Sequence, residues 1–155
     1  MLFTLRIAEP RDIPGMAAIR AAEWETQAYW EQRISGYLAG THNPQRALPE
    51  RAAFVAEDGG AVAGFVAGHR TRRFDCDGEL EWINVAATHR GQGIAGQLFA
   101  AMAAWFLEQQ AWRVCVNVTP ENTAARALYG RLGAVSFKEY WMVWPDIRAS
   151  LPRGR

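Results

Sequence analysis

Glu79 to Gln97 reads Glu-Leu-Glu-Trp-Ile-Asn-Val-Ala-Ala-Thr-His-Arg-Gly-Gln-Gly-Ile-Ala-Gly-Gln. The pattern predicts a strand, then a loop that contains Arg90, Gly91 and Gly93, and then a helix with an apolar stripe. At a helix start, backbone N–H groups without helical partners point outward, and the helix dipole favours negative charge. Glycines remove the side chains that would hold a ligand away. The stretch therefore predicts an anion site, with phosphate as the first candidate ligand.

Three phosphate-loop patterns compete for this loop. A Walker-type loop needs Gly-Lys-Ser/Thr, and Gly93 is followed by neither a lysine nor a hydroxyl residue. Gly91, Gly93 and Gly96 have the spacing of a dinucleotide fingerprint, but that fingerprint follows the first strand of a βαβ unit. It also needs an acidic residue about 20 residues later, and residues 111–114 contain none. Arg90 to Ala95 matches the third pattern, Arg/Gln-x-x-Gly-x-Gly/Ala, at every position.

A second segment, Asn122 to Ala134, reads Asn-Thr-Ala-Ala-Arg-Ala-Leu-Tyr-Gly-Arg-Leu-Gly-Ala. Together with Arg90 to Ala95 it resembles the two signatures of the GNAT superfamily of acyl-CoA-dependent N-acyltransferases. The interval between them has room for one helix and one strand, as that family requires. The resemblance extends from about Thr4 to Trp144. Ala134 replaces the usual aromatic residue, a difference that affects packing more than chemistry.

Composition narrows the class of protein. The chain has 155 residues, 50% of them hydrophobic, which predicts one domain over residues 1–155 with a sizeable core. A formal net charge of +1 gives no reason to expect nucleic acid or an anionic membrane as a partner. The N-terminus turns polar too early for a signal peptide, and no apolar run is long enough to span a membrane, so a cytoplasmic protein is expected. Cys76 and Cys115 form no disulfide framework, and Cys and His show no metal-ligand spacing, so no metal is expected.

The order of elements predicts a mostly antiparallel sheet flanked by helices. The expected elements in the first half are a strand at 3–8, a helix that runs to about Ala22 with Asp12 as its N-cap, a helix at 25–38, a loop at 41–51, and strands at 52–57 and 61–72 around an Asp58-Gly59-Gly60 turn. They continue with a strand at 80–85, a helix at 93–110, a strand at 112–118, a helix from Asn122 to Gly133, and a hairpin over 135–144. Only the strands at 80–85 and 112–118 must run parallel, because the long helix joins them. The tail beyond Pro145 is expected to be an ordinary chain end, frayed after Pro152.

The resemblance implies the GNAT fold, an α/β (α+β) arrangement. Such a fold has a mixed sheet of about six to seven strands with about four flanking helices. Its central parallel pair splays apart to admit the pantetheine arm of the cofactor. The resemblance also implies acetyl-CoA as co-substrate, with acetyl as the expected acyl group.

The implied cofactor-binding residues fall in three groups. The loop and helix start offer N–H groups to the pyrophosphate, and Arg90 adds positive charge. The exposed backbone around Val85 and Ala87 pairs with pantetheine, and Asn122 both caps its helix and bonds the same arm. The full set is Val85, Ala87, Arg90, Gly91, Gln92, Gly93, Ile94, Ala95, Gly96, Asn122, Ala125 and Tyr129.

Glu79, Glu81 and Tyr129 are the candidate catalytic residues. An alkyl amine has a pKa near about 10.4 and is almost wholly protonated at neutral pH, so it needs a base. Glu79 and Glu81 share one face of a regular strand. The resemblance aligns Glu79 with the carboxylate base of some members, whereas Glu81 lies closer to the expected thioester, and both alternatives stay open. Tyr129 matches the general acid of the family, and a phenol with a pKa near about 10 is protonated at pH 7.

The acceptor site is the least determined part. Trp24, Tyr29 and Trp30 put large aromatics among acidic residues, which leaves open either a pocket or simple packing onto the sheet. As a pocket with Glu81 they would bind the acceptor, and a small cationic amine would suit it; a protein or peptide amine also remains open. A homodimer through the last strand or through Trp141 and Trp144 is a further expectation.

The remaining candidate residues are two histidines and a basic run. Residues 69–73 are expected to be a solvated strand end, with contact to a phosphorylated ligand as the alternative. If neither glutamate is the base, His69 and His89 are next, although His89 is expected to be exposed. The function implied is N-acetylation of a primary amine, most simply of a small molecule. The alternatives are a non-catalytic acyl-CoA-binding sensor and, more distantly, a nucleotide-binding module.

Overall fold

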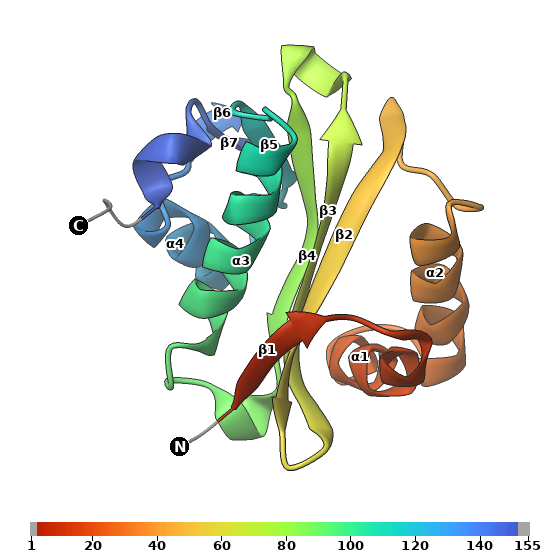
Figure 1. Ribbon diagram of the computed structural model, residues 1–155. Helices are drawn as coiled ribbons and strands as arrows, with labels where there is room; N and C mark the ends of the chain where they lie inside the picture. Colours follow the sequence, from red (N-terminus) through yellow and green to blue (C-terminus); the bar gives the residue numbers. More distant parts are fainter. Residues whose placement is uncertain (1–2, 152–155) are drawn as a thin grey trace.

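A computed structural model describes residues 3–151. Figure 1 shows a twisted sheet with α1 and α2 on one face and α3 and α4 on the other. The seven strands lie in the order β1-β2-β3-β4-β5-β7-β6. Their bounds are β1 Thr4–Ile7, β2 Ala47–Asp58, β3 Ala61–Thr71, β4 Gly78–Val85, β5 Val114–Asn117, β6 Val135–Lys138 and β7 Trp141–Trp144. The helices are α1 Ile13–Ala21, α2 Gln27–Ala39, α3 Ile94–Glu108 and α4 Thr123–Arg131, with short 3-10 helices η1 Pro10–Asp12, η2 Arg73–Asp75, η3 Ala87–His89 and η4 Ile147–Ser150.

This arrangement confirms the predicted fold class. Every neighbouring pair of strands is antiparallel except β4 and β5. The predicted turn between β2 and β3 is also present: Asp58 pairs with Ala61, and Gly59 and Gly60 have φ of 59° and 88°. Two consecutive positive φ values are those of a type I′ hairpin, which glycine adopts without steric cost.

The strand β2 is longer than expected. The segment 41–51 was predicted as a loop because of its two prolines, yet β2 begins at Ala47 and includes Pro49. The register with β3 shifts between Ala47 and Arg51, so Pro49 lies in an irregular part of the ladder. A proline is tolerated at such a place because no ladder N–H is needed there. The loop prediction was therefore wrong for residues 47–51.

The parallel pair is short and then separates. β4 and β5 pair only at Gly78–Val114, Glu79–Cys115 and Leu80–Val116. Beyond Leu80, the rest of β4 has no parallel partner on this side among residues 3–151. The predicted splay of the central pair is thus present, and it leaves β4 backbone available to a ligand.

An irregularity in β4 lies at the same point. Opposite β3, Ala67 pairs with Trp82 and Gly68 pairs with Leu80, so Glu81 is an extra residue at a bulge. Leu80 belongs to the core cluster under α3, whereas Trp82 belongs to the cluster under α1 and α2. In a regular strand these two residues would share a face. The bulge changes the direction of the side chains that follow it.

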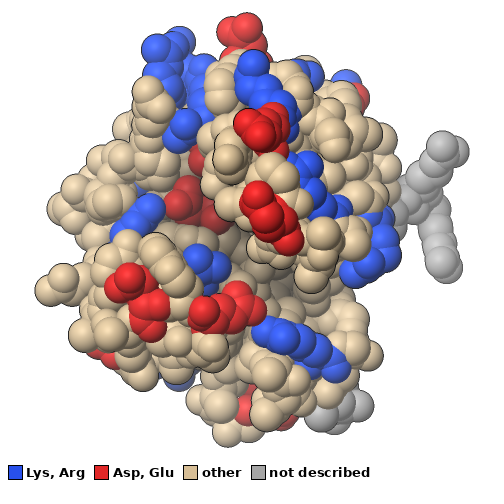
Figure 2. Space-filling view, turned by 180° about the vertical axis from the view of Figure 1, so that it is seen from behind, with Lys and Arg blue, Asp and Glu red and all other residues tan. Residues whose placement is uncertain are grey.

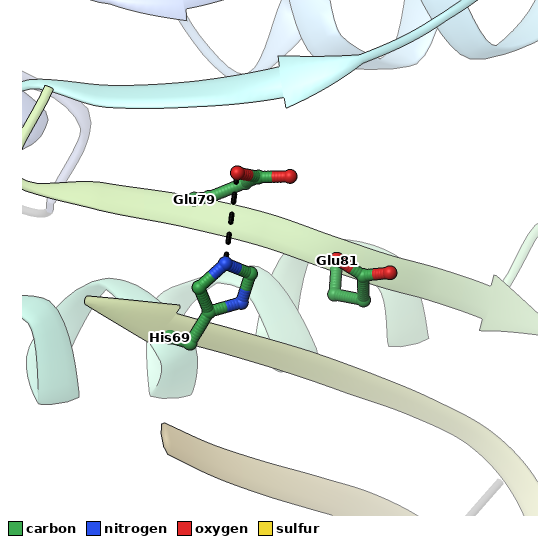
Figure 3. A group of neighbouring side chains, drawn as sticks. All are labelled: His69, Glu79 and Glu81. Atoms are coloured by element: carbon green, nitrogen blue, oxygen red, sulfur yellow. Dashed lines mark ion pairs between the residues drawn. The ribbon is translucent and has the colours of Figure 1, made fainter. Parts of the chain in front are cut away.

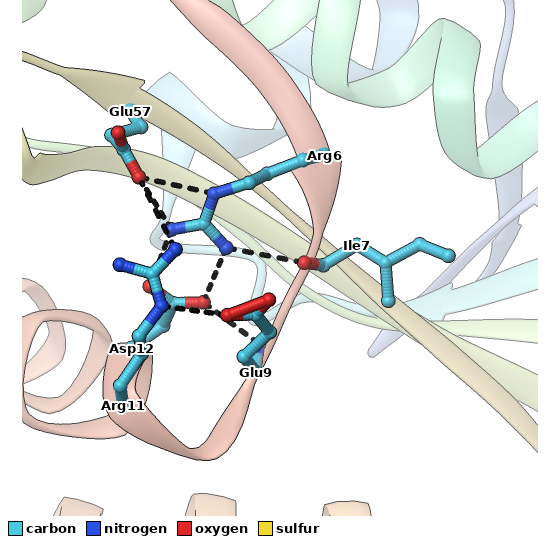
Figure 4. Close-up of polar contacts among 6 residues, drawn as sticks. All are labelled: Arg6, Ile7, Glu9, Arg11, Asp12 and Glu57. Carbon is cyan, nitrogen blue, oxygen red and sulfur yellow. Dashed lines mark hydrogen bonds and ion pairs between the residues drawn. The ribbon is translucent and has the colours of Figure 1, made fainter.

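A polar cluster fixes the start of the chain (Figure 4). Asp12 was predicted to be the N-cap of α1, but its side chain caps no N–H of that helix. Instead Asp12 accepts two hydrogen bonds from Arg6 at 2.8 Å and one from the Glu9 N–H at 2.7 Å. Arg6 also bonds Glu57 at the end of β2. The cap prediction was therefore wrong, because Arg6 and the Glu9 N–H occupy the carboxylate.

Two predictions concerned the C-terminal part, namely a dimer surface and a frayed end. Trp144 is fully buried and donates its Nε1–H to the Leu132 carbonyl, so it offers no exposed dimer surface, contrary to prediction. The fraying predicted after Pro152 lies outside the described residues. Within residues 3–151, no helix has both the length and the apolar character needed to cross a bilayer.

Candidate functional site

A cavity of about 1100 Å³ opens where β4 and β5 separate. Its walls come from β4, the loop and first turn of α3, α4, the C-terminal end of α1, α2 and η2. Figure 2 shows a hollowed face on which acidic and basic side chains both gather around the depression. The cavity joins the predicted anion site to the predicted catalytic residues in a single space.

The anion site has the expected backbone. Gly91 and Gly93 have φ of 80° and 81°, in the left-handed region that favours glycine. A Cβ at Gly91, Gly93 or Gly96 would meet no heavy atom within 4 Å, so these positions face open space. Arg90, Ile94 and Ala95 also line the cavity. The first turn of α3 thus presents unpaired N–H groups to a space that a ligand can enter.

Not all of the predicted cofactor residues line the cavity. Val85 lines the cavity, whereas Ala87 and Gln92 do not. The Arg90 side chain bonds the Val85 carbonyl at 3.3 Å and Glu23 at 3.1 Å, and it is mostly exposed. A solvent-exposed pair of this kind is weak, so an anionic ligand can compete for Arg90.

The helix α4 supplies the opposite wall. Asn122 is the N-cap of α4 and accepts a hydrogen bond from the Ala125 N–H at 3.1 Å, as predicted. Asn122, Ala125 and Tyr129 all line the cavity. Tyr129 is 8% exposed and packs edge-on against Trp144, with ring centroids 5.9 Å apart. Burial raises the pKa of Tyr129 to about 12, so its hydroxyl keeps its proton at neutral pH.

Glu79 lies in a buried polar network (Figure 3). It is 4% exposed, and its Oε1 accepts a hydrogen bond from Arg73 Nε at 3.1 Å. The same oxygen lies 3.5 Å from His69 Nε2, and the other ring nitrogen of His69 is 2.8 Å from the Tyr37 hydroxyl. Burial raises the pKa of Tyr37, so its hydroxyl keeps its proton at neutral pH.

Glu81 has a longer polar contact than Glu79. Its contact is with Arg33 of α2, where Nη2 lies 3.5 Å from Oε2. Burial, and then the nearby charge of Glu79, raise the pKa of Glu81 above its ordinary value. Both glutamates line the cavity, on the face of the sheet that α2 covers. A carboxylate with a raised pKa is a better proton acceptor than an ordinary one.

His69, Glu79 and Glu81 also form a group that no sequence spacing predicted. One ligand atom from each lies within 4.8 Å of the others, a geometry that could hold a metal ion. Arg33 and Arg73 already place positive charge beside both carboxylates. This supply of positive charge disfavours a cation at the same place.

The basic run and His89 also differ from expectation. His69 is fully buried and Arg73 pairs with Glu79, so residues 69–73 are not a solvated strand end. His89 is half-buried rather than exposed, and its Nε2 lies 2.8 Å from Asp58 Oδ2. Neither placement is visible in the sequence, because both depend on strand pairing and turns that bring distant segments together.

The aromatics predicted to bind the acceptor do not line the cavity. Trp24 and Tyr29 are 59% and 40% exposed, whereas Trp30 is 3% exposed and packs beneath them. Trp30 contacts Trp82 edge-on at 6.1 Å, and Trp82 is the aromatic that reaches the cavity wall. The alternative of packing onto the sheet therefore describes Trp30.

The same wall contains two arginines that no sequence pattern predicted, Arg20 and Arg33, together with Arg73 of the basic run. Arg20 of α1 lies over the Trp30 ring at 4.3 Å and donates to Asn84 Oδ1 at 3.1 Å. A helical arginine is usually solvated, so only the neighbouring aromatics hinted at these positions.

Comparison with known proteins identifies a family model and a relative that match the chain. The family model described as "Acetyltransferase (GNAT) family" matches residues 16–134. YobR of Bacillus subtilis (strain 168), an uncharacterized N-acetyltransferase, is 36% identical over 63 residues, which are 41% of this chain and 26% of that protein. The chain thus spans about a quarter of the length of this relative.

Solved structures share the fold over most of their length. A protein assigned to the GNAT family from Desulfovibrio desulfuricans has a TM-score of 0.75 and 13% identity, with coverage of 94% of this chain and 99% of that chain. The GNAT family N-acetyltransferase YhbS from Escherichia coli, solved with CoA, has a TM-score of 0.67 and 22% identity, with coverage of 91% and 79%. PaiA N-acetyltransferase from Thermoplasma acidophilum, also solved with coenzyme A, has a TM-score of 0.67 and 10% identity, with coverage of 92% and 98%. At these identities the likeness shows the fold, and the family model, which covers most of the chain, shows that the protein belongs to the acetyltransferase (GNAT) family.

Proposed function

We propose that this protein is an N-acetyltransferase that transfers an acetyl group from acetyl-CoA to a primary amine of a small molecule. The observation that carries the proposal is a single cavity that unites a glycine-lined anion cradle, two buried carboxylates and a buried tyrosine. Two relatives of the same fold are described as complexes with CoA. Among the residues that line the cavity, each step of acyl transfer to an amine finds a candidate group.

The cofactor end would be held mainly by backbone. In this proposal the pyrophosphate meets the N–H groups of the first turn of α3, with Arg90 adding charge. The free edge of β4 around Val85 pairs with the pantetheine amides, as an added strand would. Asn122 and Ala125 border the same channel from α4.

Glu81 is the proposed base and Tyr129 the proposed acid. Glu81 takes a proton from the acceptor ammonium, whose nitrogen then attacks the thioester carbonyl carbon. The C–N bond forms, the C–S bond breaks, and Tyr129 donates its hydroxyl proton to the departing thiolate. The proton that the nitrogen still carries in excess of the amide then returns the phenolate of Tyr129 to its neutral form, and Glu81 releases its own proton to solvent. The raised pKa values of both groups suit these directions, because a more basic carboxylate accepts a proton better and Tyr129 stays protonated until it is needed. Glu79 is engaged by Arg73 and faces His69, so it is proposed to position and polarise the site rather than to accept the proton.

Free-thiol release from acetyl-CoA across a panel of primary amines tests the proposal. An acetyltransferase releases one thiol and forms one amide for each turnover, and amide formation is checked by mass spectrometry. A non-catalytic sensor of acyl-CoA would bind acetyl-CoA in calorimetry and release no thiol above the amine-free rate. Tight binding of ATP or NAD without binding of CoA would instead support a nucleotide-binding module.

A further inference from the structure

The acceptor end of the cavity contains more arginine than its carboxylates require. Arg20, Arg33 and Arg73 line this end, together with Glu79 and Glu81. The other carboxylate of the wall, Glu23, pairs with Arg90 at the cofactor end. Two carboxylates therefore face three guanidinium groups around the place where the amine must bind. An excess of positive charge is unexpected for a pocket that accepts only an ammonium ion.

Arg20 has no acidic partner within the described residues 3–151. Its polar contact is with the neutral Asn84 side chain, and its guanidinium lies over the Trp30 ring. Its Nε is buried without a hydrogen-bond partner. Burial lowers the pKa of Arg20, which reflects the cost of removing a charge from water without a counter-ion. An anion at this position would remove that cost.

Arg33 has an unused donor of the same kind. One terminal nitrogen lies 3.5 Å from Glu81, which is at the limit of a hydrogen bond. The other, Nη1, is buried and has no partner in the part of the chain described. Its guanidinium lies 5.4 Å from the Trp82 ring, which helps to hold the side chain in place. A guanidinium with a free N–H edge is suited to a planar carboxylate, which accepts two parallel hydrogen bonds.

We infer that the acceptor carries a carboxylate close to its primary amine, as a free amino acid does. This inference rests on the proposed function and names its substrate class. The amine faces Glu81, and the carboxylate is bound by Arg20 and Arg33 across the same pocket. The Arg33–Glu81 contact is long, at 3.5 Å, so a bound zwitterion can offer each of these groups a closer partner of opposite charge. A purely cationic amine, which the sequence suggested, would leave Arg20 and Arg33 unsatisfied.

A panel of matched acceptors tests the inference with the wild-type protein. Each amino acid is compared with its amide and with its decarboxylated amine, and kcat/KM is expressed per unprotonated amine to remove differences in amine pKa. The amino acid should exceed both partners by about 10-fold or more, the factor typical of a hydrogen bond to a charged group. Equal or higher kcat/KM for the amide or the decarboxylated amine would overturn the inference and leave the proposed function standing. Absence of thiol release with every amine, despite CoA binding, would overturn both.

Variants of Arg20 and Arg33 test where the carboxylate of the acceptor binds. Arg33→Met and Arg20→Met should each reduce the preference for the amino acid over its amide to near unity, with the KM for acetyl-CoA unchanged. Arg33→Lys should restore part of the preference, because it keeps the charge but not the planar pair of donors. Arg11→Met is the matched control, since Arg11 is exposed, pairs with Glu9 and does not line the cavity. An increased KM for acetyl-CoA with an unchanged preference for the amino acid over its amide would assign these arginines to the cofactor and overturn the inference. If a variant fails to fold, the wild-type panel decides.

Discussion

At the scale of single residues, Glu79 and Glu81 look alike in the sequence and differ in the structure. Both are glutamates of β4 that line the cavity. Glu79 accepts a hydrogen bond from Arg73, whereas the contact of Glu81 with Arg33 is 3.5 Å long. The bulge at Glu81 has no counterpart at Glu79. Glu79 thus has a close cationic partner, whereas burial leaves Glu81 with a raised pKa.

Replacement of Glu81 by Gln should separate the two carboxylates. Glu81→Gln should lower kcat by about 10²–10⁴-fold, the range for loss of a general base, and remove the acid limb of the pH profile of kcat/KM. Glu79→Gln should keep that limb. Steady-state rates between pH 5 and 10 provide the measurement. If Glu79→Gln loses the acid limb and Glu81→Gln keeps it, the assignment is reversed.

The same variant should be more stable than the wild type at neutral pH. The pKa of Glu81 is raised in the folded state, so the unfolded chain releases the proton first as pH rises, and ionisation costs stability above the ordinary carboxyl pKa of about 4.3. Glu81→Gln removes this cost, and Tm should rise at pH 8 but not at pH 4. Glu79→Gln should lower Tm at pH 8, because Arg73 loses its partner. A lower Tm for Glu81→Gln at pH 8 would show that its pairing with Arg33 dominates.

The proposed role of Tyr129 as general acid can be tested by removing its hydroxyl group. Tyr129→Phe keeps the ring that packs against Trp144 and removes the proposed proton donor. We expect kcat to fall by about 10²-fold or more, while the Kd for acetyl-CoA, measured by calorimetry, stays within about threefold. Tyr140→Phe, at an exposed tyrosine, is the matched control. An unchanged kcat for Tyr129→Phe would exclude Tyr129 as the acid.

At the scale of elements, the start of α3 is built for a ligand rather than for helix stability. Gly96 lies in the first turn of this helix, where glycine is less stable than alanine by about 0.5–1 kcal/mol. Nothing in the protein requires the glycine, since a Cβ would meet no heavy atom within 4 Å. Gly96 lines the cavity, so the proposed pyrophosphate site would account for this cost, because the absence of a side chain lets a ligand approach closely.

Gly96→Ala should therefore raise Tm and weaken cofactor binding together. The added methyl group favours the helix but projects where the pyrophosphate is proposed to bind, so the KM for acetyl-CoA should increase by about 10-fold. Gly130→Ala provides the comparison, because Gly130 is also helical and also faces open space, yet does not line the cavity. It should raise Tm and leave KM unchanged. An unchanged KM for Gly96→Ala would place the pyrophosphate elsewhere.

Elements that follow from local chemistry were predicted well. The turn at Gly59 and Gly60, the cap at Asn122 and the start of α3 each depend on a few neighbouring residues, and each is where the pattern indicated. The extension of β2 through Pro49 was missed, because a register shift against β3 accommodates the proline. The bulge at Glu81 was missed for the same reason. A register is set by the partner strand, and the sequence of one strand does not contain it.

At the scale of the whole molecule, the site lies where two separately covered faces of the sheet meet. The residues proposed to bind the cofactor come from α3, α4 and β4, and they were predicted from their spacing in the chain. The residues proposed to select the acceptor, Arg20 and Arg33, come from α1 and α2. They reach the cavity only because those helices pack on the other face, over Phe65 and Trp82. The sequence therefore predicted most of the residues that line the cavity from α3, α4 and β4, but not the arginines that α1 and α2 contribute.

The N-terminal segment is joined to the sheet by the Arg6, Asp12 and Glu57 cluster, which ties β1, the start of α1 and the end of β2 together (Figure 4). Arg6 holds the pKa of Asp12 below its ordinary value. A lowered folded pKa means that the cluster stabilises the fold above the unfolded pKa of about 3.9 and loses this effect as pH falls through the folded value. Asp12→Asn should therefore lower Tm at pH 7, with a difference from wild type that narrows below about pH 4.

Asp146→Asn is the matched control for this cluster. Asp146 also pairs with an arginine and also has a lowered pKa, but Arg148 is two residues away and the pair is exposed. Such a pair joins no distant segments, so its loss should change Tm by less than thermal unfolding resolves. Equal losses in the two variants, or a loss for Asp12→Asn that does not change with pH, would show that the carboxylate charge is not what holds α1 against the sheet. Since α1 carries Arg20 to the cavity, Asp12→Asn should also weaken the preference for a carboxylate-bearing acceptor at pH 7, through position rather than contact.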